Sequence, residues 1–296
     1  MIGTVRENRT TRLVIEVLIV LAAAVFVLPV VLIFITSLKP DAEIVQFQSI
    51  LPRDPATGWQ ENFGHVLNTP EEVPILPELN WRSWRSLRFG WLGNSLFISA
   101  CVTLLVLTVD SLAAYALARL NLPGRRAVFG LIVATLMVPG QILFVPVYLI
   151  LNRLGWIDTP WALIVPAGAG AFGVFLLHQF FKGIPRELEE AAAIDGCTRL
   201  GIYWHVVLPL SRPALATLGI FTFIGSWNDF LGPLVFLDSL DRYTLPVGIA
   251  LFQSSYASEY GLTMAASVLC TLPIIVVFLL FSKHIIRGMS LSGLKE

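Results

Sequence analysis

The sequence predicts an all-α integral membrane protein. Its 296 residues are 56% hydrophobic and only 14% charged, and the mean hydropathy is +0.76, which is more apolar than ordinary soluble domains. The apolar residues gather in six windows of about 20 residues or more. Because lipid offers an exposed backbone no hydrogen-bond partners, and because the windows are too long for barrel strands, each window is expected to be a transmembrane helix.

The six windows set the expected domain organisation. They lie at 13–38, 92–118, 127–151, 160–181, 214–237 and 262–282. Residues 1–12 precede a first span that is too long for the apolar region of a signal peptide. Residues 39–91 form an external lobe, rich in Pro, Trp and Asn, that lacks an apolar run of its own. A five-span core follows at 92–283, with a loop at 182–213 and a tail at 284–296.

Basic residues in the short loops indicate the orientation, because lysine and arginine gather on the cytosolic side. With the N-terminus inside, the cytosolic loops and tail hold most of these cations: Arg119, Arg125, Arg126, Lys182, Arg186, Arg199, Arg212, Lys283 and Arg287. The opposite short loops hold only Arg153 and Arg242. The lobe also carries basic residues, but long loops escape this rule. Both termini are therefore expected in the cytosol.

Several function classes lack the residues that they require. The 20 basic and 20 acidic residues balance, so no net charge attracts nucleic acid. The three cysteines, Cys101, Cys197 and Cys270, have neither disulfide nor metal spacing. The chain has no Gly-x-x-x-x-Gly-Lys-Ser/Thr phosphate loop and no convergent set of catalytic groups. We therefore expect a non-catalytic protein with no cofactor or metal of its own.

The stretch from Pro185 to Pro209, which we call the helical knob, is the most informative segment. Pro185 suits the first turn of a helix. Gly196 is placed to end that helix in a left-handed cap, and Thr198 to cap a second helix. Pro209 is expected to stop the second helix. Two short helices at an angle should therefore form a compact projection on the cytosolic side.

Two interpretations of the knob compete. An amphipathic loop helix often lies on the bilayer surface, with basic residues on its polar face. This helix instead begins with Glu187, Glu189 and Glu190, which suit the positive end of the helix dipole and which anionic headgroups repel. A protein partner with basic side chains explains the acidic face better.

The knob contains Glu190-Ala191-Ala192, Gly196 and Leu208-Pro209 at a spacing that resembles the coupling motif of permease subunits in binding-protein-dependent ABC importers. Further stretches are similar to the six-span, maltose-transporter-type carbohydrate permeases: Thr36-Ser37-Leu38-Lys39-Pro40, Leu112-Ala113-Ala114-Tyr115-Ala116, Trp227-Asn228-Asp229-Phe230, Thr244-Leu245-Pro246-Val247-Gly248 and Met264-Ala265-Ala266-Ser267-Val268. The resemblance covers nearly the whole chain after the first dozen residues and is weakest over 41–90. It departs at Cys197, where the family often has a small residue such as alanine.

This resemblance implies a type I ABC importer permease architecture with a cytosolic coupling-helix pair. The knob would enter a cleft of a cytosolic ATPase and transmit nucleotide-driven closure through Glu190, Ala191, Ala192, Asp195, Gly196, Leu208 and Pro209. Two ATPase subunits would bind ATP and Mg²⁺, because the chain has no phosphate loop of its own. The other implied partners are a second homologous permease subunit, an extracytoplasmic solute-binding protein and the lipid of a prokaryotic cytoplasmic (inner) membrane.

Trp227, Asn228, Asp229 and Phe230 are the candidate substrate-pathway residues. Asn228 lies 14 residues beyond Ala214, or about 21 Å at about 1.5 Å per residue, in a hydrocarbon core of about 30 Å. Polar side chains at that depth are expected to face the bundle interior or a watery cavity, and the neighbouring aromatic rings suit a sugar. In a second interpretation, Asn228 and Asp229 bridge helices or end the span before Gly232-Pro233.

Asp110 is a charge deep in the second expected span. A proton relay would need further intramembrane acids or histidines, and only His178 in the fourth span is available, so structural pairing is the favoured interpretation. Close helix approach and kinks are expected at a set of small and proline residues: Gly168, Gly170, Pro139-Gly140 and Pro146.

The loop from Asp238 to Tyr260 is polar and aromatic enough to engage another protein on the external side. Its candidate contacts for the binding protein are Asp241, Arg242, Gln253 and Tyr256. The alternative is an ordinary connector.

The function indicated is ATP-driven import of a carbohydrate, whether a sugar, an oligosaccharide, a polyol or a sugar phosphate, with this chain as half of the pathway. The alternative is a secondary active transporter, which would need coupling-ion acids near the midplane and would transport without ATP.

Overall fold

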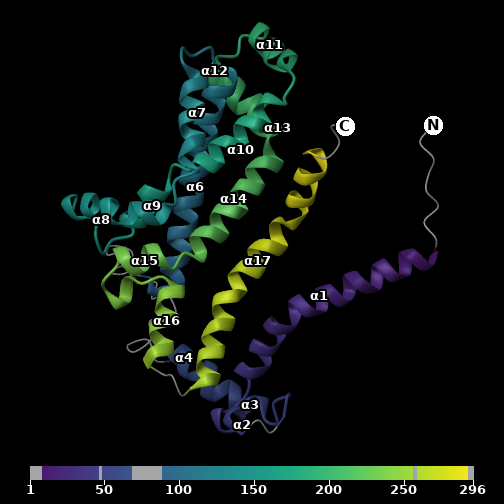
Figure 1. The fold of residues 1–296 in the computed structure, drawn as a ribbon, viewed down its shortest axis with the longest axis vertical. Helices are drawn as coiled ribbons and strands as arrows, with labels where there is room; N and C mark the ends of the chain where they lie inside the picture. Colours follow the sequence, from purple (N-terminus) through teal and green to yellow (C-terminus); the bar gives the residue numbers. More distant parts are fainter. Residues whose placement is uncertain (1–8, 47–48, 69–88, 256–258, 293–296) are drawn as a thin grey trace. The chain divides into compact units, whose positions relative to one another are not determined.

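The computed structural model describes residues 9–46, 49–68, 89–255 and 259–292, which form helices and turns without a β-strand (Figure 1). They confirm the predicted all-α class. The contacts divide the chain into two compact units. The first comprises residues 1–73 and 251–269, and the second comprises residues 74–250 and 270–296.

The first unit is built on the end of α1 (Arg9–Ser37). The chain then folds into α2 (Asp41–Val45), α3 (Pro55–Gly58), a π-helical turn η1 (Trp59–Phe63) and α4 (Gly64–Asn68). The buried Asn62 amide donates to the carbonyl oxygens of Ser37 at 2.9 Å and Lys39 at 2.8 Å. These bonds satisfy carbonyl groups that the helix end leaves free. Within the described residues 39–46 and 49–68, Asn62 therefore holds this segment against the end of the first helix.

The same unit contains the start of α17 (Tyr260–Ser292). Phe63, Ala265 and Val268 form a small buried core. The Asp41 carboxylate accepts a hydrogen bond from the Gly261 backbone N–H at 2.8 Å. Gly261 lies at the N-terminal end of α17, where a negative charge is favourable. In the sequence, the lobe and the start of α17 belong to different expected parts of the protein. Their packing into one unit is visible only in the structure.

The second unit is organised around α6 (Gly90–Arg119). Helices α10 (Ala171–Lys182) and α14 (Arg212–Trp227) pack along it, and Val106, Leu177 and Leu218 are buried between them. Around them lie α7 (Arg125–Thr135), α8 (Phe144–Arg153), α9 (Trp161–Ala167) and α15 (Leu231–Phe236). In Figure 1, α11 (Arg186–Ile194) and α12 (Arg199–Ile202) lie toward the end of α6, and α15 lies toward the opposite end of this unit.

Membrane-spanning length is met by three helices of the described chain: Leu13–Ser37, Gly90–Arg119 and Trp161–Lys182. Two bent pairs qualify when each is taken as one span: Arg125–Thr135 with Gly140–Arg153, bent by 93°, and Arg199–Leu210 with Arg212–Trp227, bent by 78°. The described part of α17, Tyr260–Val276, is a shorter apolar helix. Each of the six apolar windows therefore falls on helix, but three of them are interrupted: 127–151, 160–181 and 214–237.

Two of the expected spans, 127–151 and 214–237, are not continuous helices. The first breaks at Pro139, which has an extended backbone (φ −61°, ψ 125°) and precedes a short 3₁₀ turn at Gly140–Leu143. Proline cannot donate to the preceding turn, and it restricts the residue before it, so the helix ends there. The kink expected at Pro139-Gly140 is thus confirmed. The second window breaks after Trp227, where α14 ends and Asn228 leaves the helix.

Trp91 ties the start of α6 to the segment before α16 (Leu245–Ser255). Its side chain is 2% exposed, and its indole N–H donates to the Leu240 carbonyl at 2.7 Å. The ring lies directly against Gly248, where a Cβ would overlap the ring carbons. Only glycine allows this close approach.

We expect Gly248→Ala to destabilise the protein by about 1–3 kcal/mol, because the added methyl must displace the indole ring. Gly130→Ala is the matched control: Gly130 lies in α7 with nothing within 4 Å of a Cβ, and alanine should stabilise that helix by up to about 1 kcal/mol. Thermal unfolding of the purified protein in detergent measures both. Equal unfolding temperatures for the two variants would contradict this packing.

Candidate functional site

The helical knob has the local structure that its sequence predicts. Helix α11 begins directly after Pro185 and ends before Gly196, which adopts the left-handed conformation with φ +85°. Alanine or a larger residue would be strained there. The Thr198 hydroxyl accepts a hydrogen bond from the Gly201 N–H at 3.1 Å and caps α12. Both caps are confirmed.

The expected stop at Pro209 is wrong. The chain continues from α12 through a π-helical turn, η3 (Tyr203–Val207), into α13 (Leu208–Leu210), so Pro209 lies inside the helical path. In the wider turn, the Leu208 N–H reaches back to the Tyr203 carbonyl. This rearranged bonding accommodates a proline that has no N–H to contribute. The path ends at Ser211, where the bend into α14 begins.

The tip of the knob is open to solvent. Glu190, Ala191, Asp195, Gly196 and Pro209 are exposed, and Ala192 and Leu208 are half-buried against the core of the unit. Ile194 is 87% exposed and Leu200 is 62% exposed. Apolar side chains presented this way are typical of a surface that another protein covers.

Glu189 does not belong to the acidic face that the sequence suggests. Its side chain is 9% exposed and forms an ion pair with Arg119, the last residue of α6, with 3.0 Å between Arg119 Nε and Glu189 Oε1. The expectation that three glutamates face a partner is therefore corrected to Glu187 and Glu190. Glu189 turns inward on the face of α11 that meets Arg119, whereas Glu187 and Glu190 lie on its exposed side.

Arg119 makes further contacts that fix the base of the knob. Its guanidinium donates to the carbonyl oxygens of Phe181 and Ile184, at the C-terminal end of α10. A cation is favourable at that end of a helix. In the sequence, Arg119 stands out only as one of several loop cations, since neither Glu189 nor these carbonyls are near it along the chain.

Two tyrosines attach α6 to the second half of the knob. The Tyr115 hydroxyl donates to the Arg199 carbonyl at 3.1 Å. Ser111 and Tyr203 share a buried hydrogen bond of 2.7 Å between their hydroxyl groups. The tyrosine rings pack at 5.2 Å between centroids. One face of α6 therefore holds both parts of the knob, α11 through Arg119 and α12 with η3 through Tyr115 and Ser111.

A cavity of about 340 Å³ lies between α6, α10 and α14. Its lining is mostly apolar, but two carboxylates, Asp110 and Asp229, line it together with the hydroxyl groups of Thr222, Ser226 and Thr244. Asp229 also lines a second cavity, of about 470 Å³, beside α8 and α9. A largely apolar cavity with a few polar groups is the usual form of a small-molecule site.

Asp110 is fully buried and caps α10. Its Oδ1 accepts a hydrogen bond from the Gly170 N–H at 3.1 Å, at the break between α9 and α10. A carboxylate at this position complements the positive end of the helix. Asp110 Oδ1 is thus paired with the backbone at Gly170, whereas its buried Oδ2 has no hydrogen-bond partner among the described residues. The structural role favoured for Asp110 stays a prediction.

The four candidate substrate-pathway residues differ in their exposure to solvent. Trp227 is 1% exposed and its indole N–H donates to the Cys270 carbonyl at 3.2 Å, so it packs inside the unit. Asn228, Asp229 and Phe230 are exposed. Because α14 ends at Trp227, the interpretation that Asn228 and Asp229 end the helix is confirmed, while Asp229 also reaches the cavity.

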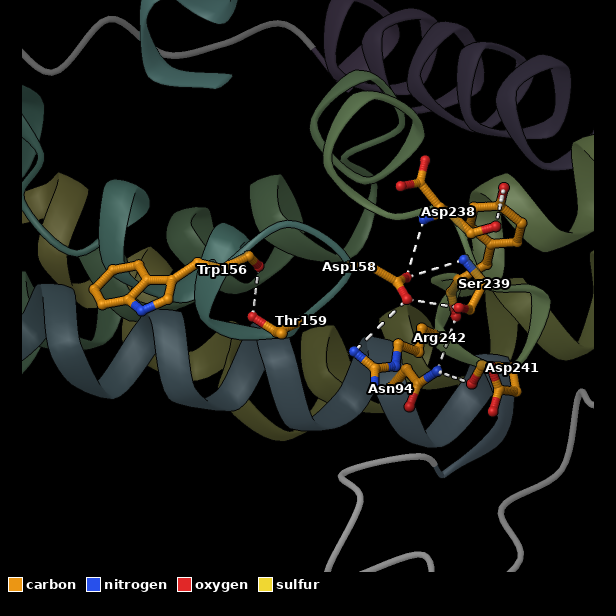
Figure 2. Close-up of polar contacts among 9 residues, drawn as sticks. Asn94, Trp156, Asp158, Thr159, Asp238, Ser239, Asp241 and Arg242 are labelled. Atoms are coloured by element: carbon orange, nitrogen blue, oxygen red, sulfur yellow. Dashed lines mark hydrogen bonds and ion pairs between the residues drawn. The ribbon is translucent and has the colours of Figure 1, made fainter. Parts of the chain in front are cut away.

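A polar cluster around Asp158, which we call the clamp, joins the loop before α9 to the loop before α16 (Figure 2). Asp158, with φ +57°, accepts hydrogen bonds from the backbone N–H groups of Asp238 at 3.0 Å and Ser239 at 2.9 Å, and from the Ser239 hydroxyl at 2.5 Å. Arg242 lies 3.7 Å from the same carboxylate. Burial raises the pKa of Asp158, but these hydrogen bonds and the Arg242 charge lower it more, so the pKa lies below its usual value.

The clamp orders part of the loop that the sequence assigns to binding-protein contact. The Asn94 amide donates to the carbonyl oxygens of Asp241 at 2.9 Å and Tyr243 at 3.0 Å, so α6 holds the segment around Arg242. Gln253 is exposed on α16, and Tyr256 lies outside the described residues. An apolar helix thus occupies much of what the sequence suggests to be a polar loop.

The comparisons with known proteins agree with one another. Residues 110–291 match the family described as binding-protein-dependent transport system inner membrane components. The chain is 34% identical over 273 residues to the arabinooligosaccharides transport system permease protein AraQ of Halalkalibacterium halodurans, covering 92% of each chain. It is 31% identical over 299 residues to the trehalose/maltose transport system permease protein MalG of Thermococcus litoralis, covering 98% of this chain and 99% of MalG.

A third relative, the sulfoquinovosyl glycerol transport system permease protein SmoH of Agrobacterium fabrum, is 39% identical over 207 residues, covering 69% of this chain and 73% of SmoH. Among solved structures, a chain of a bacterial ABC transporter involved in import of the acidic polysaccharide alginate superposes with a TM-score of 0.75. That match covers 96% of this chain and all of the other, at 24% identity. The expected importer architecture is confirmed at the level of the fold.

Glu189→Gln is expected to lower the free energy of unfolding by about 3 kcal/mol, because it leaves the buried Arg119 charge without its counter-ion. Glu190→Gln removes the same charge from the next residue, which is exposed, and should change stability by no more than about 0.5 kcal/mol. Denaturant unfolding in detergent compares the two. Equal losses would show that the ion pair does not hold the knob.

The Asp158 clamp should weaken in acid. A carboxylate with a depressed folded pKa contributes stability above its unfolded pKa of about 3.9, and this contribution is lost as the pH falls through the folded pKa. Asp158→Asn tolerates the positive φ but lacks the charge. Its unfolding temperature should lie below that of the wild type at about pH 6 and approach it by about pH 3. If the difference in unfolding temperature between the variant and the wild type stays constant over this pH range, the ionised carboxylate is not the source of that difference.

Proposed function

The chain belongs to the family of binding-protein-dependent transport system inner membrane components, and from that premise we propose that it is a permease subunit of an ATP-driven carbohydrate importer. In this role it forms half of a translocation pathway and catalyses no reaction itself. The single observation that supports this most strongly is the knob. Its tip is exposed, and its base is tied to α6 by the buried Arg119–Glu189 pair.

The proposal of a carbohydrate rests on the relatives and on the cavity. The names of the three relatives above refer to arabinooligosaccharides, trehalose and maltose, and sulfoquinovosyl glycerol. The cavity of about 340 Å³ offers Asp110, Asp229 and three hydroxyl groups in an apolar wall. Carboxylates and hydroxyl groups bond sugar hydroxyls, and apolar walls pack on the sugar ring. Since Trp227 packs internally and Asp229 lines both cavities, Asp229 is the best placed of the four pathway residues to meet a solute.

Coupling would proceed through the knob. A cytosolic ATPase subunit binds ATP and Mg²⁺ and covers the exposed tip, where Glu190 meets a basic side chain and Ala191, Ala192 and Gly196 allow close approach. Leu208 and Pro209 form the far edge of the same contact. When the ATPase subunits close, the knob moves, and Arg119 passes that movement to the ends of α6 and α10.

The complete importer would contain a second homologous permease subunit, two ATPase subunits and an extracytoplasmic solute-binding protein. It would lie in the cytoplasmic (inner) membrane of a prokaryote, with both termini of this chain in the cytosol. The apolar side chains along α1 are exposed in this single chain, which suits lipid or a neighbouring subunit. The clamped loop around Asp241 and Arg242 would face the binding protein.

A secondary active transporter is the competing function, and the two carboxylates of the cavity are the observation that favours it, because coupling ions bind such groups. Asp110, however, already serves to cap α10. ATP dependence separates the two functions: import into vesicles that persists without ATP, driven by an ion gradient, would contradict the importer.

Glu190→Lys should abolish solute-dependent ATP hydrolysis and import, because it opposes a basic partner with a second positive charge. Glu61→Lys is the control, since it makes the same charge reversal at an exposed position in the lobe. The two assembled complexes are compared in proteoliposomes. Wild-type coupling in Glu190→Lys, with normal assembly, would overturn the assignment of the knob.

A further inference from the structure

A third pocket, of about 280 Å³, lies beside the knob where four helices meet. It is formed at the end of α6, the start of α7, the end of α10 and the start of α11. We call it the basic pocket, because five of its nine lining residues are arginine or lysine: Arg119, Arg125, Arg126, Lys182 and Arg186. The other four are Leu117, Ala118, Phe129 and His178, so no carboxylate lines it.

The charges of this pocket are largely uncompensated. Arg119 has its counter-ion in Glu189, whereas the other four cations have no ion pair with a carboxylate anywhere in the described part of the chain. Arg125 and Arg126 also occupy the first turn of α7, which contains no acidic residue. Cations are unfavourable at that positive end of a helix. A bound anion would offset both the repulsion among the clustered cations and the repulsion between Arg125, Arg126 and the positive end of α7.

His178 gives an independent indication of a ligand. Its side chain is 3% exposed, its ring stacks on Phe129 at 3.8 Å between centroids, and its Nδ1 has no hydrogen-bond partner. Buried polar atoms without a partner are rare and call for an explanation. Because His178 lines the basic pocket, its Nδ1 is available to an oxygen atom of a bound anion.

The position of the pocket indicates where the anion comes from. Arg119 and Lys182 are the last residues of two membrane-spanning helices, and Arg125 is the first residue of a bent span. The pocket therefore lies at the boundary between hydrocarbon and water, with Leu117, Ala118 and Phe129 as its apolar part. Basic pockets between transmembrane helices at the cytoplasmic surface are suited to the phosphate groups of lipids.

We propose that the basic pocket binds a phosphate group supplied by the headgroup of an anionic phospholipid. Arg125, Arg126, Lys182 and Arg186 surround the phosphate, and His178 Nδ1 reaches one of its oxygen atoms. Since Arg119 lines the same pocket and holds Glu189, the bound lipid rests against the base of the knob.

The test is native mass spectrometry of the assembled transporter, delipidated in neutral detergent and titrated with phosphatidylglycerol, phosphatidylcholine or inorganic phosphate. We expect phosphatidylglycerol to bind more tightly than phosphatidylcholine. The variant Arg126→Gln/Lys182→Gln changes two exposed side chains without an ion pair, so folding should be preserved. It should bind phosphatidylglycerol about 30-fold more weakly, since each cation near an anionic lipid contributes about 1 kcal/mol and a tenfold change is about 1.4 kcal/mol.

Arg153→Gln/Arg212→Gln is the matched control, because it removes two exposed cations outside the pocket and should leave lipid binding unchanged. Equal weakening in both double variants, or equal binding of the two lipids, would overturn the proposal. Binding of inorganic phosphate without a preference for phosphatidylglycerol would overturn the lipid source. A pocket that takes up neither phosphatidylglycerol nor inorganic phosphate in the assembled transporter would also overturn the proposal.

Discussion

The ion pair between Arg119 and Glu189 is the interaction on which the rest of the second unit depends. Both side chains are nearly inaccessible to solvent, at 4% and 9% exposure. Two charges are removed from water at a considerable free-energy cost, which only good geometry and additional hydrogen bonds offset. Arg119 supplies the additional hydrogen bonds, because its guanidinium donates also to the Phe181 and Ile184 carbonyls. As a result, α6, α10 and α11 meet at one side chain.

This arrangement explains why the knob combines a solvent-exposed tip with a rigid base. Tyr115 and Ser111 secure the second half of the knob to the same face of α6. At its other end, α6 holds the segment around Arg242 through Asn94, and Asp158 clamps that segment to the loop before α9. One long helix thus connects the surface proposed to meet the ATPase, the wall of the cavity and the loops proposed to meet the binding protein.

Features with a local cause could be predicted from the sequence. The caps at Gly196 and Thr198, the break at Pro139 and the helical windows each depend on residues close to one another along the chain, and the structure has all of them. The errors are of two kinds. Pro209 continues a helix because a π-helical turn accommodates it, and this depends on how Tyr203 packs against α6. Glu189 turns inward to pair with Arg119, which lies 70 residues earlier in the sequence. Asp110 and Asp158 likewise bond to backbone groups that are distant along the chain. Tertiary contacts of this range leave no periodic signal in a sequence.

The central claim is that Arg119 and Glu189 act as one unit at the base of the knob. A double-mutant cycle with Arg119→Met, Glu189→Met and the combined variant, followed by denaturant unfolding in detergent, tests it most directly. We predict that each single variant loses more stability than the combined one, with an interaction energy of at least about 1.5 kcal/mol, because each single change leaves a buried charge uncompensated. Losses that add to within about 0.5 kcal/mol would show that the two residues are independent, and would contradict the account.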